Sequence, residues 1–119
     1  MNIESYRQFC LSLNGVSESI PFSKLPDVLV FKVCGKMFTA TDLNTFNSFS
    51  IKCVPETIEE LRVQYPALEE PSYFSKKHWC NVVLDGSVSD EQLYEWLELS
   101  YRLVVANLTK KDRVSLEVG

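Results

Sequence analysis

A short apolar run followed by a glycine turn constrains the fold more than any other stretch of this chain. Residues 28–33 read Val-Leu-Val-Phe-Lys-Val, which is typical of a β-strand, and Gly35-Lys36 follows closely. A Gly-X pair between two such runs predicts a two-residue hairpin, whose turn sets the register of the strands. The predicted partners are Cys34 with Met37, Val33 with Phe38, Lys32 with Thr39, and Phe31 with Ala40.

The predicted hairpin has two unlike faces, because successive side chains of a strand point to opposite sides of the sheet. One face is apolar and is the expected core face. The other face is mixed and is expected to be partly solvated. The apolar face carries Leu29, Phe31, Val33, Phe38 and Ala40, and the mixed face carries Val30, Lys32, Cys34, Met37 and Thr39.

Lysines on the mixed face are the first candidate binding residues. A third strand is expected at residues 47–53, with Ser50 and Lys52 on the side opposite to its apolar residues. If the two strands share that side, Lys32 and Lys52 lie on one face, with Lys36 at its rim. This arrangement predicts a local basic face. The alternative interpretation is a solvated sheet face, whose lysines also discourage pairing at the sheet edge.

Three helices are predicted from apolar periodicity and from signals at their ends. Residues 3–13 place apolar side chains at i, i+3, i+4 and i+7. A second helix begins at Pro55, a residue that suits the first helical position, and it ends at Pro66. The third helix starts with a capping box formed by Ser89 and Gln92 and continues through Leu108. The last six residues are expected to form a tail without regular structure.

The remaining segments complete the architecture. Residues 16–27 and 66–78 are predicted connections, since each contains two prolines, and Tyr73-Phe74 is a candidate short edge strand within the second. Residues 79–84 are predicted to be the last strand. The order is helix, three strands, helix, one or two strands, helix. This order predicts an α+β two-layer sandwich, with an antiparallel sheet and helices on one side.

Length and charge limit the possible functions. The chain has 119 residues, which predicts a single domain over residues 1–119. Its net charge of −4 and its pI near 5.0 do not favour nucleic-acid binding, which would need a local basic face. No apolar run reaches the ~18 residues of a membrane span, and the N-terminus lacks the pattern of a signal peptide. We therefore expect a cytoplasmic protein that does not associate with membranes.

The residue types that usually carry catalysis are sparse. Cys10, Cys34, Cys53 and Cys80 contain no C-x-x-C pair and lie in apolar segments, which favours buried thiols over a metal site or a disulfide framework. His78 is the single histidine, and Cys80, two residues beyond it, gives only weak support for acid–base or nucleophilic chemistry. No phosphate-binding loop or metalloprotease motif occurs. The sequence therefore predicts a non-enzymatic protein with no cofactor and no metal.

The segment Lys76-Lys77-His78-Trp79 is basic and aromatic, which suits the recognition of anions. Its lysines supply charge to phosphates, while Tyr73, Phe74 and Trp79 offer rings on which bases stack. The alternative is that the rings close an edge of the core and that the lysines keep this edge soluble. Together with the sheet lysines, the candidate nucleic-acid-binding residues are Lys32, Lys36, Lys52, Lys76, Lys77, His78 and Trp79.

Five short motifs occur in order along nearly the whole chain: Gly35-Lys36-Met37-Phe38, Ile51-Lys52-Cys53-Val54-Pro55-Glu56, Lys76-Lys77-His78-Trp79, Leu84-Asp85-Gly86 and Ser100-Tyr101-Arg102-Leu103-Val104. This pattern resembles the MmcQ/YjbR family of small bacterial proteins. The resemblance implies an α+β domain of the secretion-chaperone-like type, with a second late strand around Tyr73. It also implies DNA binding, because the family is described as DNA-binding with a double-wing motif.

The leading hypothesis is a DNA-binding protein that contacts phosphates through its lysine-bearing sheet face and its basic loop. A rival is a protein-interaction or chaperone-like module, which would bind a partner chain or a second copy through the mixed face and the aromatic residues. A small-ligand site beneath residues 73–79 is a third possibility. The expected state is a monomer or a weak homodimer.

Overall fold

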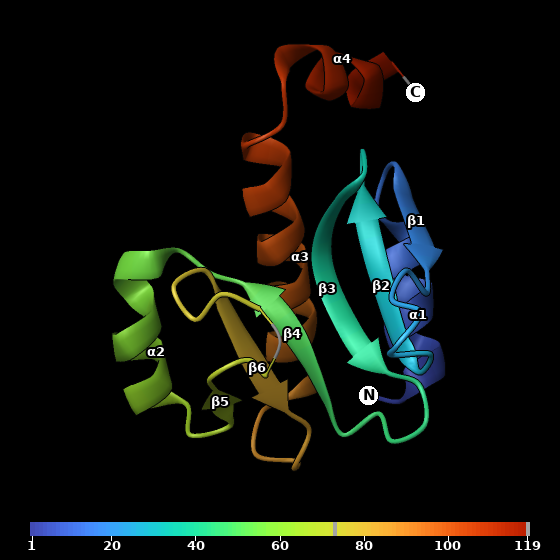
Figure 1. The fold of residues 1–119 in the computed structure, drawn as a ribbon. Coiled ribbons are helices and arrows are strands. Elements are labelled where there is room, and N and C mark those ends of the chain that lie inside the picture. The colour runs from blue at the N-terminus through green and yellow to red at the C-terminus, as the bar shows by residue number, and fades with distance from the viewer. Residues whose placement is uncertain (73, 119) are drawn as a thin grey trace.

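Six strands form one antiparallel sheet, and helices pack against one side of it (Figure 1). The structure, a computed structural model, describes residues 1–72 and 74–118. The strand order across the sheet is β1-β2-β3-β4-β6-β5. The strands are β1 (Val16–Ser19), β2 (Val28–Val33), β3 (Lys36–Asp42), β4 (Ser48–Lys52), β5 (Leu68–Glu69) and β6 (Trp79–Val83). The helices are α1 (Ile3–Ser12), α2 (Ile58–Gln64, preceded by the 3₁₀ turn Pro55–Thr57), α3 (Asp90–Ala106) and α4 (Lys110–Val118).

Helices α1 and α3 cover one face of the sheet, and the core lies between the two layers (Figure 1). Tyr6 of α1 is fully buried, and its ring centroid lies 5.5 Å from that of Phe31 and 5.4 Å from that of Phe49. Phe38 of β3 packs edge-on against Tyr101 of α3, with 5.6 Å between the centroids. The predicted α+β two-layer sandwich is therefore confirmed, as are the three predicted helices and the strands near residues 28–33, 47–53 and 79–84.

The hairpin turn lies one residue earlier than the glycine pattern predicts. Cys34 and Gly35 both have positive φ angles, 49° and 75°, and Val33 pairs with Lys36. Positive φ at both central residues is typical of a type I′ turn, whose twist matches that of the flanking strands. Lys32 then pairs with Met37, and all four predicted cross-strand partners are wrong.

A β-bulge at Phe38 follows the turn and changes which side chains face the core. The register shifts there, and Thr39 pairs with Phe31, so both side chains point toward the helices. Phe38 itself is fully buried against the helix layer, as predicted. Ala40, one residue beyond Thr39, points away from the helices. The predicted faces are thus correct for Phe38 and wrong for Thr39 and Ala40.

Two short edge strands lie in segments that the sequence predicts to be connections. Strand β1 pairs with β2, and strand β5 pairs with β6. Three of the four residues of β1 are Ser and Glu, which have little β-propensity, so the pairing with β2 is what makes this segment a strand. Phe74 lies in a bend rather than in the predicted edge strand, and Tyr73 lies outside the described residues.

The C-terminal segment, predicted to be a tail, forms helix α4. The side-chain amide of Asn14 donates a hydrogen bond of 2.6 Å to the backbone carbonyl of Leu116. The Leu116 side chain packs so closely on Gly15 that a Cβ at this position would collide with it. These contacts with the loop after α1 hold α4 in place. They join residues about 100 positions apart, so the sequence of α4 alone does not predict them. Within the described part of the chain, no helix is both long and apolar enough to cross a membrane.

Candidate functional site

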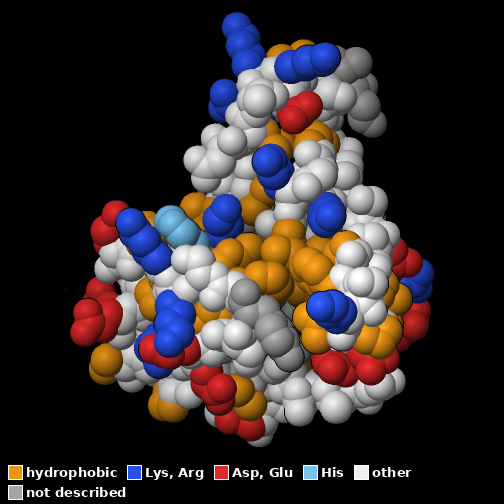
Figure 2. Space-filling view, viewed as in Figure 1, with side chains coloured by type: hydrophobic (Ala, Val, Ile, Leu, Met, Phe, Trp, Pro, Cys, Tyr) orange, Lys and Arg blue, Asp and Glu red, His pale blue; other side chains and the backbone are white. Residues whose placement is uncertain are grey.

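The sheet face that points away from α1 and α3, called the open face below, is the candidate site. Cross-strand pairing aligns Val30 with Ala40, Ala40 with Ser50, and Ser50 with Asn81, so a row of mostly short side chains crosses the middle of this face. Strand alternation then places Lys32 and Lys52 on the same face. Figure 2 views the molecule from this side and shows an apolar centre with Lys and Arg side chains around it.

Cations from several strands meet at one end of the sheet, because antiparallel strands bring alternate ends together. Lys32 lies near the end of β2 and Lys52 ends β4, both on the open face. Lys36 begins β3 opposite the core residue Val33 and so lies at the rim on the helix-covered side. Lys77 lies just before β6, and the neighbouring His78 carbonyl accepts a 2.8 Å hydrogen bond from the Cys53 amide, which ties this turn to the end of β4. In Figure 2 the histidine lies between Lys or Arg side chains. We call Lys32, Lys36, Lys52 and Lys77 the basic edge.

Two of the predicted site residues have other neighbours in the structure. The ammonium of Lys76 lies 3.0 Å from the Glu70 carboxylate, and this hydrogen bond holds the pKa of Glu70 below its usual range. Trp79 is only 8% exposed, with its ring centroid 4.9 Å from that of Phe74 and 6.0 Å from the Lys52 ammonium. Trp79 therefore anchors the turn and supports the Lys52 side chain, while Lys77 and His78 remain exposed.

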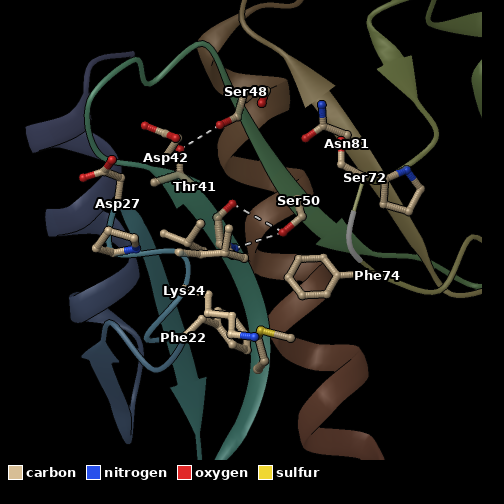
Figure 3. Close-up of a pocket in the computed structure, with 16 residues that line it drawn as sticks. Phe22, Lys24, Asp27, Thr41, Asp42, Ser48, Ser50, Ser72, Phe74 and Asn81 are labelled. Carbon is tan, nitrogen blue, oxygen red and sulfur yellow. Dashed lines mark hydrogen bonds between the residues drawn. The ribbon is translucent and has the colours of Figure 1, made fainter.

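The opposite end of the open face is acidic and hollow. Asp27, just before β2, and Asp42, at the end of β3, border a cavity of about 660 Å³ (Figure 3). The segment 22–28 forms one wall, and Pro71, Ser72 and Phe74 form the other. Ala40, Ser50 and Asn81 form much of the floor. Sequence reasoning placed a possible ligand site beneath residues 73–79 but missed the second wall. The segment Leu25-Pro26-Asp27 was the available signal, and it reads only as a turn.

Ser100 of α3 positions the lysine end of strand β4. Its hydroxyl donates a 2.6 Å hydrogen bond to the Phe38 carbonyl and accepts a 2.8 Å hydrogen bond from the Lys52 amide. The ladder between β3 and β4 ends at Thr39 and Ile51. Beyond it, the Phe38 carbonyl and the Lys52 amide are not paired with each other across the bulge. One buried hydroxyl therefore replaces the missing rung and fixes where Lys52 begins.

The described residues offer little for catalysis or metal binding. All four cysteines are free thiols, and burial raises the pKa of Cys10. Cys80 is fully buried in the core, whereas His78 is exposed, so the two do not form an activated pair. No group of three or more His, Cys, Asp or Glu side chains within residues 1–72 and 74–118 is arranged to hold a metal ion.

Comparisons with known proteins agree with this fold. A sequence model of the YjbR family matches residues 11–103. The chain is 29% identical to the uncharacterized protein YjbR of Escherichia coli K12 over 119 residues, with 95% of each chain covered. It is 28% identical to the uncharacterized protein YbdF of Escherichia coli O157:H7, with 98% of this chain and 94% of the relative covered.

Solved structures of related proteins have the same fold. The crystal structure of Deinococcus radiodurans DR2400 superposes with a TM-score of 0.88 and 36% identity, covering 98% of this chain and 88% of that chain. A Pseudomonas syringae protein superposes with a TM-score of 0.72 at 22% identity, over 87% of this chain and 98% of that chain, which supports the fold alone. Since the family match runs from the end of α1 through most of α3, and so includes the whole sheet, the chain belongs to the YjbR family.

Proposed function

We propose that this protein binds nucleic acid, with DNA as the expected ligand, through phosphate contacts made by the basic edge. The observation that carries the proposal is the register of the sheet, which places Lys32 and Lys52 together on the open face, with Lys36 at the rim of the same end of the sheet and Lys77 just before β6. Lysines that converge on one edge attract a polyanion even when the net charge of the protein is −4.

The members of the predicted site have different roles in this proposal. Lys36 and Lys77 are exposed, Lys32 and Lys52 are half-buried on the open face, and all four contact phosphates. His78 adds a hydrogen-bond donor beside them. Lys76 contributes less, because Glu70 already neutralises part of its charge. Trp79 holds the turn in place rather than stacking on a base.

The acidic end of the open face limits where the backbone of a bound nucleic acid can lie. Asp27 and Asp42 repel phosphates, so the backbone of the nucleic acid follows the basic edge and does not cross the whole face. This placement agrees with the DNA binding that the family resemblance implies.

The test is the salt dependence of binding, measured by fluorescence anisotropy with a short labelled duplex. The variant K32Q/K36Q/K52Q is compared with K110Q/K111Q/R113Q, which removes three exposed cations from α4 and so has the same net charge. In the first variant we expect weaker binding and a shallower slope of log K against log salt. The magnitude of this negative slope should fall by about 2–3, since each lost phosphate contact contributes about 0.9.

The α4 variant should keep nearly the slope of the unchanged protein, because α4 lies beyond the end of the sheet and not on the open face (Figure 1). Equal losses in the two variants would show that only net charge matters, and the basic edge would not be the site. No binding of the unchanged protein at low salt, where electrostatic attraction is strongest, would overturn the proposal itself.

A further inference from the structure

The cavity at the acidic end of the open face has the size and the lining of a small-molecule site. Its volume of about 660 Å³ falls in the middle of the range of about 300–1,000 Å³ that ligand pockets occupy. Two walls lie on either side of the floor, one from residues 22–28 and one from Pro71, Ser72 and Phe74 (Figure 3). The cavity is therefore a recess over the sheet, with the basic edge beyond its far end.

The walls of the recess carry two aromatic rings, Phe22 and Phe74. The Phe74 ring is held by Trp79, whose centroid is 4.9 Å away, so it presents a fixed surface. Phe22 is 37% exposed and lies at the mouth. Rings at a mouth and in a wall favour a flat aromatic guest, because stacked rings gain more than the area they bury.

The floor is low because its side chains are short. The Ser50 hydroxyl donates to the Ala40 carbonyl at 3.3 Å and accepts from the Ala40 amide at 3.1 Å, so its own hydrogen bonds are made within the sheet. Asn81 lies beside Ser50 in the register and adds a side-chain amide. A flat guest can thus lie on the sheet and still meet one amide that both donates and accepts.

The charged groups at the two ends select the chemistry of the guest. The carboxylate of Asp42 is held in place, because its Oδ1 accepts the amides of Asn44 and Thr45 at 2.9 and 3.2 Å. With Asp27 it offers hydrogen-bond acceptors at the acidic end of the cavity, whereas Lys24 at the lining and Lys32 and Lys52 beyond it offer cations. A guest that complements both ends is aromatic, carries amino groups at one side and is anionic at the other.

We infer that this cavity receives one unpaired nucleobase, either of a free nucleotide or of a single strand, with its amino group toward Asp27 and Asp42 and its phosphate toward the lysines. The inference rests on the proposed function for the single-strand case, and it narrows the ligand from nucleic acid in general to nucleic acid with an unpaired base. A base that remains in a duplex cannot enter the recess, because its faces are stacked and its pairing edge is used.

The base types differ in a way that the acidic end makes measurable. Cytosine and adenine carry an exocyclic amino group, whereas thymine presents carbonyl oxygens in its place. A carboxylate accepts from the amino group and repels the carbonyl. Oligo(dC) therefore binds more tightly than oligo(dT) of equal length, and D27N reduces this preference because the amide supplies a donor as well as an acceptor.

The experiment titrates the protein by anisotropy with labelled oligo(dC), oligo(dT) and a duplex of the same length, and by calorimetry with AMP and CMP. The variant F22A removes the ring at the mouth, and I20A is its matched control, because Ile20 is 50% exposed two residues earlier in the chain but does not line the cavity. Circular dichroism and the melting temperature establish that both variants fold. A further variant at the site, D27N, keeps the shape of the side chain and therefore tests the same site with little risk to folding.

The expected result is that oligo(dC) binds more tightly than the duplex. F22A should weaken oligo(dC) binding about ten-fold, which is within the range for loss of one base–aromatic stack, while I20A leaves it unchanged. If single strands and the duplex bind equally and F22A changes neither, the inference is wrong and the proposed function stands. If AMP or CMP binds with the same F22A dependence but no oligonucleotide binds, the cavity assignment stands and the proposed function is wrong. If neither nucleotides nor oligonucleotides bind, both are wrong.

Discussion

The two faces of the sheet are built from the same strands but with side chains of opposite character. The helix-covered face carries large rings such as Phe31 and Phe49, which are at most 1% exposed, and its polar atoms are paired within the core, as in the 2.9 Å bond between the Tyr6 and Thr39 hydroxyls. The open face carries Ala40 and Ser50 at its centre. Large side chains fill the space between layers, whereas short ones leave a recess.

Because of this difference, we expect side chains of the covered face to contribute mainly to stability and those of the open face mainly to binding. A ring on the covered face contributes to the folded state, because its removal leaves a void that neighbours fill only in part. A ring on the open face lies beside a cavity that is already empty, so its removal changes mainly what the cavity can hold. Substitutions matched in chemistry but placed on opposite faces should therefore give opposite results.

The largest effect is expected for F49A compared with F74A. Phe49 is 1% exposed, and its substitution should lower the free energy of unfolding by about 3–5 kcal/mol. Phe74 is only partly buried, and the loss of its contact with Trp79 should cost about 1 kcal/mol. Urea unfolding followed by tryptophan fluorescence measures both. Equal losses in the two variants would mean that the open face is part of the core and that the two faces do not differ in their contribution to stability.

An intermediate effect is expected for S100A, which removes the one hydroxyl that joins the covered face to the lysine end of the open face. The Phe38 carbonyl and the Lys52 amide would lose their partner, so the free energy of unfolding should fall by about 2 kcal/mol. S115A, at an exposed position of α4, is the matched control and should change stability little. Faster hydrogen exchange at the Lys52 amide in S100A would locate the loss, and unchanged exchange there would contradict this role of Ser100.

The covered face was the more predictable of the two. Alternation of apolar residues in β2 and β4 identifies Leu29, Phe31, Phe49 and Ile51 as core residues without further information. The faces of Thr39 and Ala40 were predicted wrongly, because the bulge at Phe38 moves the alternation by one residue and a one-residue slip exchanges faces. The bulge depends on Ser100, 62 residues away, which no local pattern reveals.

The open face could be predicted only in its charges. Lys32 and Lys52 lie on this face because each alternates with the core residues of its own recognisable strand. This alternation does not depend on the hairpin register, which was predicted wrongly. The cavity could not be derived in the same way, because its walls come from the segment 22–28 and from Pro71, Ser72 and Phe74, which meet only because β2, β3, β4 and β6 pair side by side. Edge strand β1 and helix α4 were missed for a similar reason, since partners distant in the sequence hold each of them.

The smallest effect is expected where the covered face reaches solvent, at the ion pair between Arg7 of α1 and Glu18 of β1. Arg7 Nε donates a 2.7 Å hydrogen bond to Glu18, and this bond holds the pKa of the Glu18 carboxyl below its usual range. A lowered pKa in the folded state means that the pair stabilises the protein at neutral pH. This stabilisation is lost as the pH falls below the ordinary glutamate pKa of about 4.3 and through the lower folded value.

Comparing E18Q with the unchanged protein tests this sign. At pH 7 the variant should melt about 1–4 °C lower, as expected for a partly exposed pair, and at pH 3 the two melting temperatures should converge. E95Q, at an exposed position of α3, is the control and should show no such convergence. A difference that persists unchanged at pH 3 would show that Glu18 acts through packing rather than through its charge. The helix layer would then hold β1 by the same apolar contacts as the rest of the covered face.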